Sequence, residues 1–293
     1  MDRFLLLAPA LLLLATLCVT FALYCGLCAL GRTPEVGRVK HNQFFNLFMA
    51  RYLVWLIGPI ERLLLGRVSP NTITALSLMM CALCGIAVAI GQLGGAVWLY
   101  AVAGILDIMD GRLARLQNKQ TSSGALFDSV SDRWGELFVF TGYAWYLRDT
   151  AWIVAVMAAA GSSLMVSYTR ARAEGLKIEL SGGLMQRAER VFLTTCGTML
   201  AAWYGTNPDS PTASVDSITI VGGTMAVCSV ACVATALNRW IVAYKMLAKR
   251  DALQVPIIEE QAMPVQQPVA VSRPPEIFAP VPKALRESAE LPL

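Results

Sequence analysis

Charged residues are scarce in this chain of 293 residues: only 15% are Asp, Glu, Lys or Arg, whereas 56% are hydrophobic. Soluble domains carry about 25% charged and roughly 45–50% apolar residues. The length would allow two soluble domains, but this composition is that of a membrane protein. Histidine is nearly absent as well, because His41 is the only one. Metal sites that need several histidines are therefore excluded.

Charge is entirely missing from residues 4–30. A signal-peptide core has about 7–15 apolar residues, whereas crossing a bilayer takes roughly 20. We therefore predict a transmembrane helix within residues 1–33. Residues 34–67 mix aromatic and aliphatic side chains with basic ones and include Pro59. This pattern is typical of a juxtamembrane amphipathic helix that lies on the membrane surface, and a short buried span is the alternative.

Six further helices are predicted from the apolar runs, at about residues 69–90, 97–116, 123–147, 151–172, 186–204 and 218–244. The first begins favourably, because Ser69 can cap it and Pro70 fits its first turn. The predicted fold class is an all-α membrane protein. It has a six-helix transmembrane core (68–250), a juxtamembrane surface helix (34–67) and one extra N-terminal transmembrane helix (1–33). Residues 251–293 are rich in proline, which predicts a flexible tail.

Basic residues gather on one side of this predicted bundle. They lie around residues 112–119 and 170–190 and directly after the last core helix, whereas the opposite loops contain only Arg148. The positive-inside rule places the basic side in the cytoplasm. We therefore predict a multi-pass protein of a bacterial inner or plasma membrane, with its C-terminal tail in the cytoplasm.

All eight cysteines lie inside apolar runs. Cys25 and Cys28, like Cys81 and Cys84, have the CxxC spacing, but no histidine or further cysteine pair flanks them. We interpret the cysteines as small polarizable residues that pack between helices, rather than as a metal or redox site.

Four aspartates stand in "DIMDGRLARLQNKQTSSGALFDSVSD", residues 107–132. If the second and third core helices form an antiparallel hairpin, Asp107 and Asp132 come level, and so do Asp110 and Asp128. Each pair on one helix shares a face, at i, i+3 or i, i+4. The four carboxylates are therefore expected to converge near the cytoplasmic surface. Solvated helix ends would explain one or two aspartates, but they explain four on matched faces poorly.

Converging carboxylates repel unless a cation or protons neutralise them. Ligands that are all oxygen suit hard cations such as Mg²⁺, Mn²⁺ or Ca²⁺, and four carboxylates can hold two ions about 3.5–4 Å apart. Gly111, Ala114 and Gly124 leave space beside the aspartates for a ligand, and Arg115 could meet a phosphate. The residues alone thus favour a metal site that handles phosphate.

The same segment resembles the signature of the CDP-alcohol phosphotransferase family. Asp107-x-x-Asp110-Gly111-x-x-Ala114-Arg115 is followed, after eight residues, by Gly124-x-x-x-Asp128-x-x-x-Asp132. The resemblance extends over roughly residues 68–249 and includes a similar surface helix before them. It implies a six-helix core, usually dimeric, whose active site faces the cytoplasm. It also implies cleavage of a CDP-linked substrate, release of CMP and transfer of the remaining phosphoryl group to an alcohol.

The resemblance also implies roles for particular residues. Asp107, Asp110 and Asp128 would bind Mg²⁺ or Mn²⁺, as two ions, and Asp132 would be the general base, a metal ligand or both. The cytidine nucleotide would be bound by Asn71, Thr74, Asp107, Gly111, Ala114, Arg115 and Gly124. The membrane setting favours CDP-diacylglycerol as the donor among CDP-alcohols, with its acyl chains in the lipid. No nucleic-acid partner is expected.

The acceptor depends on a second region, "SYTRARAEGL" and "SGGLMQRAER". It resembles the bacterial phosphatidylinositol-phosphate and phosphatidylglycerophosphate synthases, which implies that the acceptor phosphate is bound by Ser167, Arg170, Arg187 and Arg190. Ala188 replaces a proline expected in that branch, so inositol phosphate and glycerol 3-phosphate both stay open. Positive-inside anchoring is the plainer explanation for these arginines.

Two other functions stay open at this point. One is transfer of a phospho-alcohol from a soluble CDP-alcohol to a lipid acceptor. The other is a metal-binding membrane protein or transporter without catalysis, although the sequence shows no inverted repeat or paired broken helices.

Overall fold

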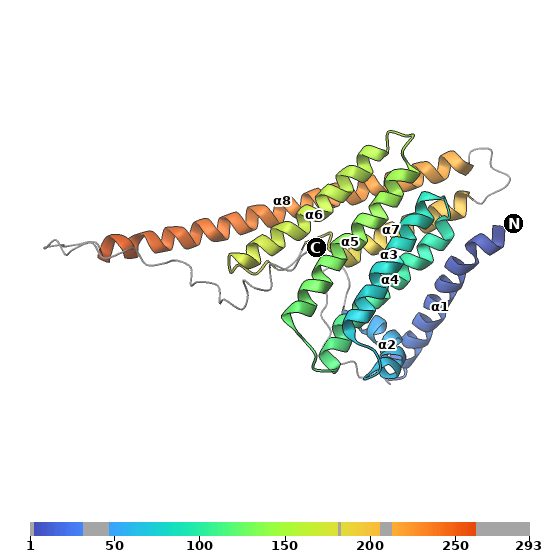
Figure 1. Cartoon of the computed structure of the whole chain (residues 1–293), viewed down its shortest axis with the longest axis horizontal. Coiled ribbons are helices and arrows are strands. Elements are labelled where there is room, and N and C mark those ends of the chain that lie inside the picture. The colour runs from blue at the N-terminus through green and yellow to red at the C-terminus, as the bar shows by residue number, and fades with distance from the viewer. Residues whose placement is uncertain (1–2, 32–46, 181–182, 206–212, 262–293) are drawn as a thin grey trace, which may run out of the picture. The chain divides into compact units, whose positions relative to one another are not determined.

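The computed structural model describes residues 3–31, 47–180, 183–205 and 213–261, and these residues form eight α-helices and no strand. The helices are α1 (Arg3–Ala29), α2 (Leu47–Leu64), α3 (Pro70–Ala89), α4 (Leu93–Leu116), α5 (Ser122–Tyr146), α6 (Ile153–Gly175), α7 (Arg187–Gly205) and α8 (Ala213–Gln261). The all-α class is confirmed (Figure 1). Residues 34–46 of the predicted surface segment and 262–293 of the predicted tail lie outside the described residues.

Five of these helices, α1, α3, α4, α6 and α8, are long and apolar enough to cross a membrane. Among the described helices, α5 carries Asp132 and Glu136 and α7 carries Arg187 and Arg190, which lowers their hydropathy. The described chain therefore has the helices of a multi-pass membrane protein, whereas a core of six spans stays a prediction.

The start of α3 follows the sequence closely. Ser69 accepts a hydrogen bond of 3.2 Å from the Thr72 N–H, and Pro70 occupies the first turn, as predicted. In contrast, α4 begins at Leu93 rather than near residue 97. Gly91 has a φ of 78°, which glycine adopts without penalty, so a shorter turn than predicted reverses the chain.

The two motif helices, α4 and α5, are both held by α3. α3 packs against each of them, and within the described residues the backbones of α4 and α5 make no close contact with each other. A Cβ at Gly142 of α5 would overlap the backbone of Gly85 of α3, so these two helices approach backbone to backbone, as small residues allow between membrane helices. The predicted α4–α5 hairpin is therefore not a packed helix pair, because α3 packs against both helices, yet carboxylate oxygens of Asp107, Asp110 and Asp128 still converge.

Helices α7 and α8 complete the buried core. Val221, Met225 and Cys228 of α8 are fully buried with residues of α3 to α7, and Tyr143 of α5 and Thr198 of α7 share a buried hydroxyl hydrogen bond of 2.5 Å. The start of α7 lies beside the motif aspartates, because Arg187 forms ion pairs with Asp107 and Asp132. All eight cysteines are free thiols, and four of them are buried between helices, in agreement with a packing role.

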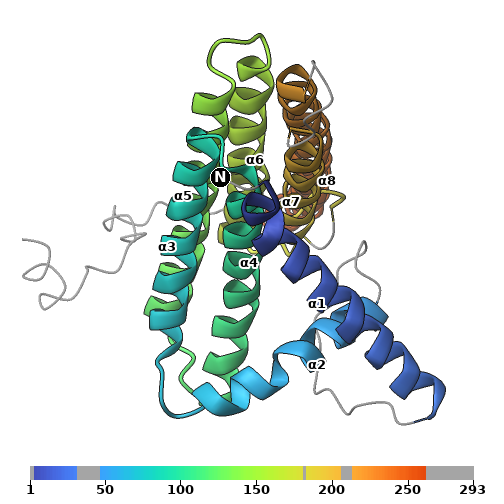
Figure 2. The ribbon, with the colours of Figure 1, turned by 90° about the vertical axis from the view of Figure 1, so that its right-hand side faces the viewer.

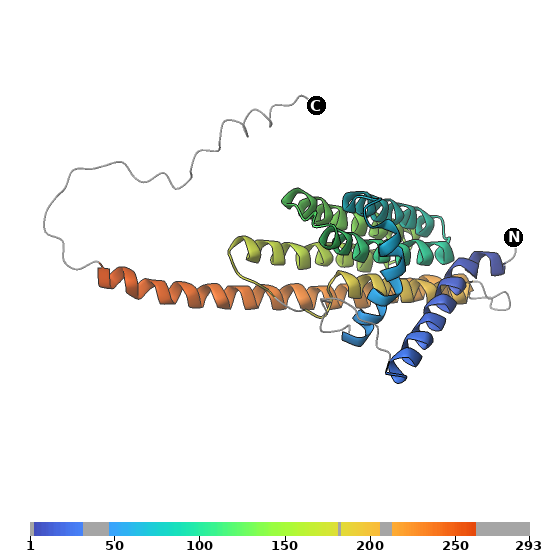
Figure 3. The same ribbon diagram turned by 90° about the horizontal axis from the view of Figure 1, so that it is seen from below.

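Outside the core, α1 and α2 pack on α4. Tyr24 of α1 contacts the rings of Phe48, Tyr52 and Trp55 of α2, and the buried Glu61 of α2 forms an ion pair with Arg112 of α4. Figures 2 and 3 show α2 crossing the direction of the bundle helices near one end of α4, while α1 leans away from the bundle toward its own C-terminal end. A position of α2 on the membrane surface stays a prediction.

The end of α8 differs from prediction. The helix runs to Gln261, past the predicted end at residue 244 and past residue 251, where we expected a flexible tail. Residues 245–255 are mostly good helix formers such as Lys, Ala, Leu and Met, and they extend the helix. The chain divides into two compact units, 1–247 and 248–293. Helices α1 to α7 belong to the first unit, as does α8 as far as Leu247.

Candidate active site

Three of the four motif aspartates form one cluster. Asp107 and Asp110, one turn apart on α4, and Asp128 on α5 each offer a carboxylate oxygen, and these oxygens lie within 4.8 Å of one another. We call Asp107, Asp110 and Asp128 the aspartate cluster. Its donors are all oxygens, which fits a hard divalent cation such as Mg²⁺ or Mn²⁺. The sequence spacing predicted this convergence, although it predicted four members rather than three.

Asp110 is the most firmly held member of the cluster. Its side chain is buried, and its two oxygens accept hydrogen bonds from the Thr74 hydroxyl at 2.6 Å and the Gly111 N–H at 2.5 Å. Thr74 stands in the first turns of α3, whose start is fixed by the Ser69 cap. Thr74 was predicted at the nucleotide site, and in this structure its hydroxyl orients a cluster carboxylate.

Asp132 is joined to the cluster through Arg187. The guanidinium of Arg187, at the first residue of α7, forms ion pairs with Asp107 and, at 2.7 Å, with Asp132. The Nε of Arg187 is buried and has no hydrogen-bond partner within the described residues. One donor of this guanidinium is therefore left for an oxygen of a ligand.

A polar cavity of about 270 Å³ opens beside Asp132. It contains all four residues predicted to bind the acceptor, together with two of the motif aspartates. Its lining is Asp107, Asp132, Arg133, Glu136, Val166, Ser167, Arg170, Gln186, Arg187, Ala188, Arg190 and Arg239. Helices α4 to α8 all contribute to it, so residues far apart in the sequence meet here. We call this space the polar cavity.

Arg190 has a different environment from the other predicted acceptor residues. Its Nε and Nη2 donate to one oxygen of Glu136 at 3.0 and 2.5 Å, and its Nη1 donates to the Met185 carbonyl. Both side chains of this ion pair are at most 4% exposed, and Ser163 donates to the other Glu136 oxygen. Arg190 thus stabilises the wall of the polar cavity through its ion pair with Glu136. Glu136 lies one turn after Asp132 and is a site residue that the motif did not indicate.

Arg239 is a second residue that the sequence reasoning missed. It lies on α8, is buried, and donates through Nη1 to the Val166 carbonyl at 2.9 Å. The available signal was an arginine within an apolar helix, which marks a functional candidate in a membrane segment. The lining of the polar cavity then holds five arginines against three carboxylates, Asp107, Asp132 and Glu136, so its net formal charge is positive although Arg170 is also paired with Glu174.

The residues predicted to bind the nucleotide lie around the motif. A Cβ at Gly124 would be 3.4 Å from Asn71 Oδ1, and one at Gly111 would be 3.6 Å from the guanidinium of Arg115. Ala114 is half-buried on α4. The structure therefore brings Asn71 close to Gly124 and Arg115 close to Gly111, while neither Gly111 nor Gly124 lines the polar cavity.

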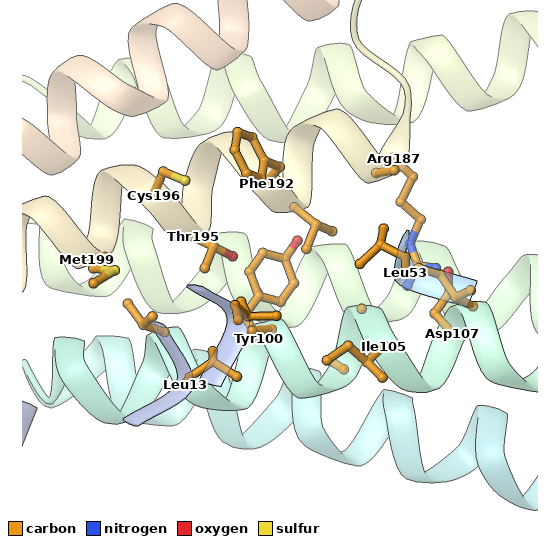
Figure 4. A pocket seen from close by; sticks show the side chains of 18 of the residues that line it. Leu13, Leu53, Tyr100, Ile105, Asp107, Arg187, Phe192, Thr195, Cys196 and Met199 are labelled. Carbon is orange, nitrogen blue, oxygen red and sulfur yellow. The ribbon is translucent and has the colours of Figure 1, made fainter. Parts of the chain in front are cut away.

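A second cavity, apolar and of about 470 Å³, lies on the other side of Asp107, between α1, α4 and α7 (Figure 4). We call it the apolar cavity. Asp107, Arg187 and Ala188 line both cavities. A ligand with a charged centre at the aspartate cluster can thus extend a polar part into one cavity and an apolar part into the other.

The sequence profile of the CDP-alcohol phosphatidyltransferase family matches residues 67–234, a span that contains the aspartate cluster, Asp132 and the arginines of α6 and α7. The chain belongs to this family. The resemblance predicted from the motif is thereby confirmed.

Among the relatives of this chain is a phosphatidylinositol phosphate synthase of Mycobacteroides abscessus, 34% identical over 116 residues. The match covers 38% of this chain and 51% of the relative, so the chain spans about half of that protein's length. An archaetidylinositol phosphate synthase of Methanothermobacter thermautotrophicus is 31% identical over 167 residues, covering 57% of this chain and 80% of the relative.

Solved structures of a relative have the same fold. The phosphatidylinositol phosphate synthase of Mycobacterium tuberculosis with CDP-DAG bound superposes with a TM-score of 0.55 at 26% identity, over 65% of this chain and 94% of that one. The same protein in complex with manganese and citrate gives a TM-score of 0.55 at 25% identity, over 64% and 88%.

Proposed function

We propose that this protein transfers the phosphatidyl group of CDP-diacylglycerol to an alcohol that carries its own phosphate, such as inositol phosphate or glycerol 3-phosphate, and releases CMP. The observation that carries the proposal is the position of Asp107. It belongs to the aspartate cluster and lines both the cationic polar cavity and the apolar cavity. A lipid donor and a phosphorylated acceptor can therefore meet at one carboxylate site.

Asp107, Asp110 and Asp128 are proposed to hold Mg²⁺ or Mn²⁺, as two ions. The bound manganese in the M. tuberculosis relative supports a divalent ion. When bound, such ions would offset the negative charge of the donor's pyrophosphate and of the leaving CMP. The Thr74 hydroxyl and the Gly111 N–H would keep the Asp110 carboxylate oriented for this role, because hydrogen bonds to a metal-binding carboxylate fix its orientation.

The acceptor is proposed to enter the polar cavity with its phosphate against Arg170 and Arg187. Guanidinium groups match phosphate oxygens bidentately, and Arg187 has the buried Nε described above. Ser167 lines the same cavity and can donate a hydrogen bond to a phosphate oxygen. Arg190, predicted as a further phosphate ligand, is reassigned to bracing the cavity through Glu136, and Arg239 adds positive charge.

Asp132 is proposed to be the general base. It lines the polar cavity but does not belong to the aspartate cluster, which favours proton transfer over metal binding. The acceptor oxygen attacks the phosphorus that bears the diacylglycerol, and its proton passes to the Asp132 carboxylate. The bond from that phosphorus to the oxygen of CMP breaks, and CMP leaves with the bonding electrons.

The remaining assignments are also proposals. Asn71, Thr74, Gly111, Ala114, Arg115 and Gly124 would hold the cytidine nucleotide. Helices α3 to α8 would be the six-span core, with α1 as an additional span and α2 on the surface. The basic loops would place the active site and the tail in the cytoplasm. The protein would form a homodimer in the membrane.

The test is release of CMP by the purified full-length protein supplied with Mg²⁺ or Mn²⁺ and CDP-diacylglycerol. Inositol phosphate, glycerol 3-phosphate, serine and inositol are offered in turn as acceptors. We expect CMP release only with one of the phosphorylated acceptors. The proposal fails if serine or free inositol serves as well, or if CMP appears only from CDP-choline or CDP-ethanolamine with diacylglycerol.

Arg170→Ala tests the acceptor site within this assay. Losing a hydrogen-bonded charge is worth about 1.5–3 kcal/mol, so we expect the KM for the phosphorylated acceptor to rise about 10- to 100-fold. The KM for CDP-diacylglycerol should stay unchanged. Arg172→Ala is the matched control, because Arg172 lies on the same helix, is also exposed and does not line the polar cavity. Equal effects of the two substitutions would refute the assignment.

A further inference from the structure

The apolar cavity is bounded by a helix that lies outside the family's shared region. Ala10, Leu13, Leu14 and Leu17 of α1 line it, whereas the family profile matches only residues 67–234. The rest of the wall consists mainly of residues of α4 and α7, including Val97, Ile105, Phe192 and Met199, and α2 and α3 add Leu53, Val54 and Cys81. The N-terminal helix therefore encloses a space against the catalytic core instead of only anchoring the chain in the membrane.

The cavity has one polar end. Figure 4 shows Asp107 and Arg187 together at one end, with Phe192 and Cys196 farther along α7 and Met199 at the opposite end. Apart from Asp107, Arg187 and Thr195, its lining is made of aliphatic, aromatic, cysteine and methionine side chains. A ligand that fits this space is a long apolar chain whose polar head lies at the aspartate cluster.

The length of the cavity fits a lipid tail. Its lining reaches from Asp107 back to Val97 on α4 and from Arg187 to Met199 on α7, which is roughly 15–18 Å at 1.5 Å per residue. The hydrocarbon of one bilayer leaflet is about half of the 30 Å core. The volume of about 470 Å³ also lies within the usual range for a ligand pocket, roughly 300–1,000 Å³.

Helix α1 is fixed in place at both ends of this wall. Ala10 is 1% exposed, and farther along, Thr20 shares a hydrogen bond of 2.8 Å with the Tyr52 hydroxyl of α2. Tyr24, buried at 2% exposure, continues this contact within the aromatic group on α2. The leucines between these anchors, Leu13 and Leu17, therefore have defined positions in the cavity wall.

We propose that α1 forms one wall of the binding site for an acyl chain of the lipid donor, and that Leu13, Leu14 and Leu17 set the length of chain that the protein accepts. This inference rests on the proposed function, because it assigns the apolar cavity to the same donor lipid. It adds a specificity role for a helix that the family's shared region does not contain.

The first experiment detects the chain directly. Full-length protein in vesicles is given a CDP-diacylglycerol analogue with a diazirine near the end of one acyl chain, then irradiated, and the labelled peptides are identified by mass spectrometry. We expect labels on residues 10–17 of α1 and 192–199 of α7, and competition by unlabelled CDP-diacylglycerol. Labelling of α7 without α1, or labelling that the competitor does not reduce, would overturn the proposal.

The second experiment changes the wall. Leu13→Trp fills part of the cavity, so we expect kcat/KM for a dioleoyl donor to fall about tenfold, which is roughly 1.4 kcal/mol. The value for a dihexanoyl donor should be unchanged, which also shows that the variant is folded. Leu12→Trp is the matched control, because Leu12 is 69% exposed and does not line the cavity. We expect it to behave as the unchanged protein with both donors.

The outcomes separate this inference from the proposed function. If no CDP-diacylglycerol releases CMP but the diazirine lipid still labels α1 competitively, the proposed reaction fails and the lipid site stands. If CMP is released and the Leu13→Trp protein has the same kcat/KM as the unchanged protein with both donors, the proposed reaction stands and the acyl-chain role of α1 is refuted. An equal loss with both donors would likewise contradict a role in chain length.

Discussion

The guanidinium of Arg187 forms ion pairs with two of the four motif aspartates. Its ion pairs with Asp107 and Asp132 offset part of the repulsion among converging carboxylates, which would otherwise oppose their approach. Arg187 is the first residue of α7, so this positive charge is supplied by a helix that begins 55 residues after Asp132, the last residue of the motif. The Arg187 guanidinium therefore links Asp132 of the polar cavity to Asp107, which belongs to both the aspartate cluster and the polar cavity.

Asp132→Asn separates a base from a metal ligand. We expect turnover to fall about 10²- to 10⁴-fold, the usual contribution of a positioned general base, because the amide cannot accept the acceptor's proton. Binding of Mn²⁺, measured by isothermal titration calorimetry, should be nearly unchanged, since Asp132 lies outside the aspartate cluster. Asp110→Asn is the contrasting variant and should weaken Mn²⁺ binding. If Asp132→Asn weakens it as strongly, Asp132 is a ligand.

The residues that could be predicted share one property: they stand at fixed spacing on two helices. Helical periodicity places Asp107 and Asp110 on one face of α4, and the convergence of Asp128 with them was expected from the antiparallel course of α4 and α5. Glu136, Arg133 and Arg239 could not be predicted in the same way, because their approach to the polar cavity depends on how α5, α6 and α8 pack. For the same reason the sequence could not indicate that the Arg190 guanidinium forms an ion pair with Glu136.

At the scale of elements, the decisive contact is that of α3 with α5. The predicted hairpin required α4 and α5 to pack directly against each other. In the described residues, α3 instead packs against both of them, and the backbones of α4 and α5 make no close contact. The α3–α5 contact depends on Gly85 and Gly142, whose positions tolerate no side chain. Helix types and most boundaries followed from apolar runs and the Ser69 cap, but pairing of the helices did not, because all of them present similar apolar surfaces.

Gly142→Ala and Gly161→Ala should change stability in opposite directions. A methyl group at Gly142 would overlap the Gly85 backbone, so α3 and α5 must separate, at about 1–3 kcal/mol for overpacking. Gly161 of α6 has open space around its Cβ position, and alanine there should stabilise the helix by about 0.5–1 kcal/mol. Thermal unfolding in the same detergent measures both. A stable Gly142→Ala protein would contradict the close α3–α5 contact.

At the scale of the whole molecule, the protein combines an aspartate cluster, a cationic cavity and an apolar cavity around one end of α4. The apolar cavity must face the hydrocarbon of the membrane for a lipid donor to enter, while the polar cavity must be reached from water. Both conditions hold if the aspartates lie near a membrane surface. Such a placement also fits α5 and α7, which carry several of the site's charges and are the two described core helices that do not count as candidate membrane spans by length and composition.

Which surface this is can be tested by thiol labelling. Asn118 and Asp149 lie just beyond opposite ends of α5, and the basic residues accompany Asn118, so the positive-inside rule puts that end in the cytoplasm. We expect an impermeant maleimide to label Asn118→Cys in inverted membrane vesicles and Asp149→Cys in right-side-out vesicles. The unsubstituted protein gives the background from its native cysteines, and detergent should make both positions reactive. The reverse pattern would place the aspartate cluster on the side without cytosolic CDP-linked substrates and acceptors, and the proposed reaction could not then use them.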